Sequence, residues 1–332
     1  MNRKMLRYVI SWVLKTEGIL MALPAITGAL YREREALAYL LCGLFCVGAG
    51  LLLSRRKPED MELYPKDGYV AVALGWVTLS VFGCLPFMAI GEIPFFVDAL
   101  FEIVSGFTTT GSSILTDVEA LSHASLFWRS FSHWIGGMGV LVFILAILPM
   151  KGGSVMNLMK AESPGPSVSK FVPRVRGTAK ILYQIYIVMT IVLILSLLLS
   201  GMTLFESLTL SFGAAGTGGF SILNSGCSTY TPVQQWILTI GMILFGVNFN
   251  FYYLILCRKF KAAALSQEVR AYFLVILAAI AAITVDIHGV YDTLGETVRH
   301  AAFQVGPLSR RQDMRRQILT SGRSFPRRFF CC

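Results

Sequence analysis

Seven apolar stretches recur along this chain, each close to the roughly 20 residues that a helix needs to cross a bilayer. They cover residues 8–30, 36–53, 69–90, 126–149, 181–200, 234–256 and 270–287. Mean hydropathy is +0.64 and only 14% of the residues are charged, whereas soluble domains carry about 25%. The pattern predicts an all-α, polytopic, multi-pass membrane protein with about seven transmembrane helices.

The basic residues indicate how these helices are oriented. They gather in every second connection, around residues 3–7, 55–66, 151–180 and 258–270. All four regions share one side of the membrane if the N-terminus is cytoplasmic, as the positive-inside rule requires. The distribution of the net charge of +10 therefore predicts an orientation in the membrane and contact with lipid, and no nucleic-acid partner.

The opposite side carries segments that are apolar enough for helices but too short to cross. Residues 94–106 lead into a Thr/Gly run at Thr108–Gly111, and residues 204–214 lead into a second at Ala215–Gly218. Residues 291–305 begin a third such segment. We expect re-entrant half-helices here, in a repeated unit of span, pore loop and span like that of potassium channels.

Thr/Gly runs held between spans suit a cation filter. Carbonyl oxygens and threonine hydroxyls can replace the water shell of an ion, and glycine permits the backbone angles that direct the carbonyls. The negative C-terminal ends of the half-helices would favour a cation at the same place. The predicted ion-coordinating residues are Thr108, Thr109, Thr110, Gly111, Ala215, Gly216, Thr217 and Gly218.

Other polar and small residues near these runs have competing interpretations. Gly136, Gly137 and Gly139 open the fourth apolar stretch, where helix packing near the pore and an ion role are both open. Glu102 and Glu206 lie early in the half-helices, where we expect structural hydrogen bonds rather than attraction of cations. The two histidines His123 and His133 lack carboxylates at ligand spacing, so potassium at the filter is the only metal predicted.

The repeats divide the chain into five parts. An N-terminal transmembrane hairpin covers residues 1–67, pore repeat one 68–160 and pore repeat two 161–265. A partial third repeat covers residues 266–305, and an arginine-rich tail covers 306–332.

Five sequence segments in this order closely resemble the TrkH/TrkG/KtrB family of bacterial potassium-uptake proteins. They are Ser105–Gly111, His133–Val140, Gly216–Ser221, Asn248–Tyr253 and Arg299–Val305. The resemblance covers about residues 1–305, and the N-terminal hairpin is similar to the TrkH branch.

The resemblance implies a function and a set of partners. It implies four repeats around one pore, with potassium as substrate and passive or coupled (symport) uptake across the bacterial inner membrane. It also implies a homodimer and a cytoplasmic, TrkA-like nucleotide-binding ring, which the loops at residues 151–177 and 258–270 would contact. Nucleotide would act only through that partner, and no covalent cofactor is expected.

The resemblance stops at Val305. Beyond it, seven arginines replace the third filter that the family pattern would continue with. Our hypothesis is a one-base deletion in the gene, because restoring one base lets the next codons encode Ser-Ser-Ile-Thr-Thr-Thr-Gly. We expect such a truncated form not to conduct.

Two alternatives remain from the sequence. One is a decayed or regulatory Trk-type subunit that binds partners without transporting. The other is an intramembrane enzyme, although the spans contain no Gly-x-Ser-x-Gly, His-Glu-x-x-His or paired aspartates.

Overall fold

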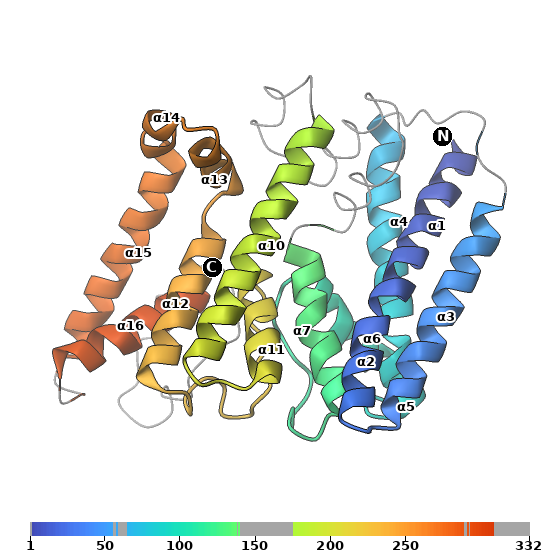
Figure 1. Ribbon diagram of the computed structural model, residues 1–332, viewed down its shortest axis with the longest axis horizontal. Helices are drawn as coiled ribbons and strands as arrows, with labels where there is room; N and C mark the ends of the chain where they lie inside the picture. Colours follow the sequence, from blue (N-terminus) through green and yellow to red (C-terminus); the bar gives the residue numbers. More distant parts are fainter. Residues whose placement is uncertain are drawn as a thin grey trace.

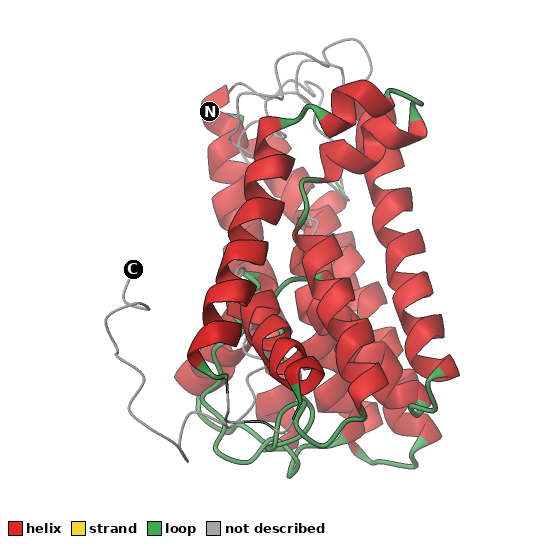
Figure 2. Cartoon of the chain, turned by 90° about the vertical axis from the view of Figure 1, so that its left-hand side faces the viewer, coloured by secondary structure: helices red, strands yellow, loops and turns green. Residues whose placement is uncertain are grey.

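The computed structural model describes residues 2–55, 58, 65–137, 139, 175–288, 291 and 293–308. Every regular element in these ranges is a helix (Figure 2). The prediction of an all-α polytopic membrane protein is confirmed. Of the predicted tail, residues 309–332 lie outside the described part of the chain, as do residues 140–174, which include the end of the fourth apolar stretch.

Five helical stretches are long and apolar enough to span a membrane. The first joins α1 (Arg3–Leu20) to α2 (Ala22–Leu30), and the second is α3 (Glu35–Ser54). The third joins α4 (Pro65–Gly83) to α5 (Leu85–Ile90). The others lie in α10 (Val175–Leu199) and α15 (Gln267–Asp286). These five correspond to predicted stretches one, two, three, five and seven.

The two remaining predicted spans look different in the structure. The fourth is seen only as α7 (His123–Gly137), since its continuation is outside the described residues. The sixth is divided into α12 (Pro232–Gly246) and α13 (Phe249–Leu256). The helix breaks because Val247 adopts an extended conformation with ψ 142°. At the break, the carbonyl of Leu244 accepts from the amide of Val247 at 3.1 Å and from the hydroxyl of Tyr252 at 2.7 Å, so it stays hydrogen-bonded.

Three short helices start at the same end of the molecule, opposite the N-terminus and α14 (Phe260–Ala264) (Figure 1). They are α6 (Phe96–Phe107), α11 (Leu204–Ala215) and α16 (Leu294–Leu308). The first two have 12 residues each, so each is about 18 Å long and too short for a bilayer. These are the half-helices that the sequence predicted.

Helix α7 lies between the first two half-helices and packs against both α6 and α11. Its aromatic side chains build much of this contact: Trp128 meets Phe107 of α6 edge-on at 6.1 Å, and Phe127 meets Phe212 of α11 edge-on at 5.6 Å. Such aromatic pairs each contribute about 0.5–1.5 kcal/mol beyond simple burial. A rigid contact therefore joins the ends of the two half-helices.

Candidate ion pathway

The first Thr/Gly segment begins in the C-terminal cap of α6. The amide of Thr109 donates to the carbonyl of Gly106 at 3.0 Å, and the amide of Thr110 donates to Ser105 at 2.9 Å. With Thr109 at φ 55°, these two bonds form a Schellman motif. The motif normally takes glycine at its left-handed position, and here it holds a threonine.

The second segment begins in the same way at the end of α11. The amide of Thr217 donates to Ala214 at 3.1 Å, and the amide of Gly218 donates to Gly213 at 3.2 Å. Thr217 has φ 57°, so a threonine again occupies the left-handed position of a Schellman motif. The two half-helices thus end in one repeated backbone design.

This backbone design sets the register between the segments. Gly111 at φ 80° and Gly219 at φ 78° follow the strained threonines at the same distance along the chain. The structural counterpart of Thr108–Gly111 is therefore Gly216–Gly219, one residue later than the predicted segment. Ala215, which we expected to coordinate ions, is the last residue of α11 and is only 3% exposed.

The Schellman bonds use the amides of these segments and leave their carbonyls free. Among the described residues, no carbonyl of Thr108–Gly111 or Gly216–Gly219 accepts a hydrogen bond from another protein group. The hydroxyl of Thr108 lies 2.8 Å from that of Thr110 and donates to Val104 at 2.7 Å. Alkali cations are coordinated by oxygen atoms of these two kinds, carbonyls without a hydrogen-bond donor and threonine hydroxyls.

Glycines let α7 approach both segments closely. A Cβ on Gly136 would collide with the carbonyl oxygen of Phe107, and one on Gly137 would lie 2.6 Å from the Cα of Gly216. Gly139, just beyond α7, has φ 74° and donates to the carbonyl of Gly136 at 3.0 Å. Gly136 and Gly137 therefore occupy the positions where α7 meets the two Thr/Gly segments.

His133 explains why the second segment has glycines where the first has threonines. Its imidazole is fully buried, and a Cβ on Gly218 would collide with the ring. A Cβ on Gly216 would collide with the carbonyl oxygen of His133. Side chains like those of Thr108 and Thr110 are thus excluded from the second segment by α7 itself.

His123 lies elsewhere, stacked on Tyr31 at 3.8 Å and within 2.7 Å of a carboxylate oxygen of Glu33. Within the described ranges, no three His, Cys, Asp or Glu side chains form a cluster suited to a metal ion. The two histidines do not form one site.

A buried ion pair beside the two Thr/Gly segments was missed by the sequence interpretation. Nε of Arg129 on α7 lies 2.7 Å from Oε1 of Glu102 on α6, with both side chains at most 2% exposed. The expected structural role of Glu102 is thus met, although its partner was not foreseen. The available signal was a lone arginine within a predicted apolar stretch, because charges there usually pair.

Glu206 makes the structural hydrogen bonds that we expected. Together with Thr203 it forms a capping box at the start of α11. In α16 the amide of Glu296 donates to the hydroxyl of Thr293 at 3.2 Å, which repeats half of that box. The third half-helix therefore starts like the second, although it has 15 residues where α11 has 12.

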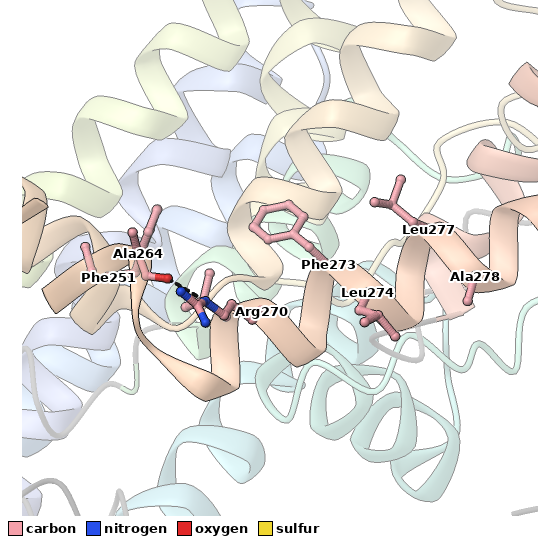
Figure 3. A pocket seen from close by; sticks show the side chains of 9 residues that line it. Phe251, Ala264, Arg270, Phe273, Leu274, Leu277 and Ala278 are labelled. Atoms are coloured by element: carbon pink, nitrogen blue, oxygen red, sulfur yellow. Dashed lines mark hydrogen bonds between the residues drawn. The ribbon is translucent and has the colours of Figure 1, made fainter. Parts of the chain in front are cut away.

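A pocket of about 600 Å³ is lined by residues of α13, α14 and α15 (Figure 3). Its wall is mainly apolar, and Nε of Arg270 donates to the carbonyl of Ala264 at its edge at 2.8 Å. None of its lining residues belongs to either Thr/Gly segment. The pocket is therefore not part of the candidate ion pathway.

Comparison with known proteins identifies related chains. A family model for TrkH, described as a cation transport protein, matches residues 34–291. The "Trk system potassium uptake protein TrkH" of Salmonella typhimurium is 34% identical over 295 residues, 86% of this chain and 60% of that protein. The "Trk system potassium uptake protein TrkG" of Escherichia coli K12 is 30% identical over 288 residues, which are 84% of this chain and 59% of that protein.

The fold is also similar to a solved structure, the crystal structure of the potassium transporter TrkH from Vibrio parahaemolyticus. The TM-score is 0.76 at 25% sequence identity, covering 93% of this chain and 64% of that one. The present chain spans about 60% of the length of the curated relatives that it matches.

Proposed function

Because this chain belongs to the TrkH family of cation transport proteins, we propose that it supplies two filter segments of a potassium-uptake pathway. The segments are Thr108–Gly111 and Gly216–Gly219, each placed at the C-terminal end of a half-helix. Family membership favours a transport protein over the intramembrane enzyme. The choice of potassium rests on the names of the related proteins.

One observation carries this proposal: threonine occupies the left-handed cap of both half-helices. A β-branched residue at positive φ is an outlier that costs about 1–2 kcal/mol relative to glycine. Strain of this kind persists where the residue or its conformation has a use. At Thr109 and Thr217, beside free carbonyls, coordination of a cation by the hydroxyl or carbonyl oxygen is that use.

The wider assignment follows the family and the charge pattern. We propose a multi-pass protein of the bacterial inner membrane with a cytoplasmic N-terminus. A TrkA-like nucleotide-binding ring and a second copy of the chain are its proposed partners. The connection between α13 and α14, with Arg258 and Lys259, and α14 itself, with Lys261, lie at the same end of the molecule as the N-terminus (Figure 1). This supports a cytoplasmic position for the N-terminus and for this basic region.

Potassium binding to the purified chain tests the proposal. Thermal unfolding in detergent would be followed as potassium replaces N-methyl-glucamine at constant ionic strength, because a bound ligand raises the unfolding temperature. We expect stabilisation by potassium, and a loss of about tenfold in affinity for Thr108→Ala.

Thr78→Ala is the matched control. The Thr78 hydroxyl, like that of Thr108, donates to the carbonyl four residues earlier at 2.7 Å, but it lies on α4 away from the filter. Equal potassium dependence in the two variants would contradict the assignment of Thr108.

A further inference from the structure

A single arginine contacts both chain segments that leave the filter. Arg129 lies on α7 and is 2% exposed, and its partner Glu102 on α6 is fully buried. Removing a guanidinium from water is costly, so it is retained only where most of its donors are used. The positions of these donors show what the arginine holds together.

The first contact is with the segment after the first filter. Ser113 donates to Glu102 at 3.0 Å, and the amide of Ile114 donates to the same carboxylate at 3.1 Å. A terminal nitrogen of Arg129 also donates to the Ser113 hydroxyl at 3.2 Å. The ion pair therefore ties the residues just beyond Gly111 to the half-helix that carries the filter.

The second contact is with the equivalent segment of the other repeat. The other terminal nitrogen of Arg129 lies 3.4 Å from the carbonyl oxygen of Ser221. The guanidinium also lies over the ring of Phe220, 4.2 Å from its centroid. Phe220 and Ser221 follow Gly219 directly, so one planar cation joins the exits of both segments.

At the position equivalent to Glu102, the second repeat has no carboxylate. Glu102 is the seventh residue of α6, and the seventh residue of α11 is Leu210. The exit of the second segment is thus held to this polar cluster through Arg129 of the first repeat. A lysine in place of Arg129 would offer a point charge instead of a planar fork and could not serve both exits.

We infer that Arg129 is a positioning residue that sets the relative placement of the two filter segments and thereby their preference among monovalent cations. The functional half of this inference rests on the proposed potassium pathway. Selectivity in such filters depends on the spacing and number of the oxygen ligands. A residue that binds both segments and fixes their relative position, as Arg129 does, controls that spacing.

The test uses Arg129→Lys and Ser113→Ala in the purified full chain. Hydrogen–deuterium exchange would report residues 112–115 and 220–223 separately, and thermal unfolding would give the apparent affinities for potassium and sodium. Arg129→Lys should speed exchange in both segments by about tenfold, the effect of losing one charge-assisted hydrogen bond. It should also lower the ratio of potassium to sodium affinity. Ser113→Ala should loosen only the first segment.

Ser125→Ala is the control, because it removes a buried hydrogen bond of α7 to Tyr39, 3.0 Å long and on the side of the N-terminal hairpin. It should change neither readout. Unchanged exchange at residues 220–223 in Arg129→Lys would overturn the link between the segments. Faster exchange with an unaltered affinity ratio would reduce Arg129 to a purely structural residue and overturn the positioning role.

If Arg129→Lys does not fold, the paired variant Glu102→Gln/Arg129→Gln, which leaves no unpaired buried charge, is judged by the same two readouts. A wild-type chain with no response to potassium or sodium would refute the proposed function. The exchange measurement would still decide whether Arg129 joins the two segments.

Discussion

Replacing Gly136 by alanine tests whether α7 must touch the first filter segment. The new Cβ would collide with the carbonyl oxygen of Phe107, and it would lie 2.8 Å from the carbonyl carbon of that residue and 3.1 Å from Cγ2 of Thr109. The two nearest obstructing atoms belong to the backbone of Phe107, which the Schellman bonds hold in place, so they cannot rotate away. Overpacking of this kind costs about 1–3 kcal/mol of folding stability. Because the obstruction is backbone, we expect Gly136→Ala to destabilise by about 3 kcal/mol, the upper end of this range.

Gly48→Ala supplies the reference for the helix propensity of alanine. Gly48 lies in α3, and a Cβ added there would have no other atom within 4 Å, so alanine meets open space. In both helices alanine gains up to about 1 kcal/mol over glycine. The difference between the two variants therefore isolates the steric cost, about 3 kcal/mol.

Denaturant unfolding in detergent measures that difference, and potassium titration measures its effect on the filter. We expect Gly48→Ala to be as stable as the wild type or slightly more so, with unchanged potassium affinity. Gly136→Ala should be less stable and bind potassium more weakly, because Phe107 immediately precedes Thr108. Equal stability of the two variants would refute the close packing of α7 on the filter.

Three further predictions follow from the same backbone. Thr109→Gly should raise stability by about 1 kcal/mol while weakening potassium binding, since it relieves the left-handed strain but removes a hydroxyl; unfolding with and without potassium checks both effects. Thr203→Ala should cost about 1 kcal/mol and speed amide exchange in the first turn of α11, because the capping box is lost. Gly218→Ala should destabilise by about 1–3 kcal/mol, and His133→Ala in the double variant should recover part of that loss; additive effects in the double-mutant cycle would argue against their contact.

Much of the fold could be predicted from hydropathy. The long spans and the three half-helices are where the apolar stretches indicated, because a run of about 20 apolar residues is stable across a bilayer whatever lies next to it. The break at Val247 was not predicted, since Tyr252 and other side chains satisfy the backbone groups there without altering the apolar pattern.

The two Thr/Gly segments were predicted less completely than the spans. Thr108–Gly111 has one obvious interpretation, but Ala215–Gly219 contains several small residues, and two alignments with the first segment fit equally well. Only the left-handed φ of Thr217 and Gly219 chooses between them. The partner of Glu102 was also hidden, because Arg129 lies in a different helix.

The sequence by itself determined the membrane class, the order of spans and half-helices, and the position of the first Thr/Gly segment. Each of these depends on contiguous residues. The free energy of inserting a span into the membrane and the backbone conformation at a helix end are both local properties of the chain. The tertiary structure alone decided that α7 separates the two segments, that His133 excludes side chains from the second, and that Arg129 joins both exits. These features depend on contacts between residues far apart in the chain, and such contacts form only when the helices pack.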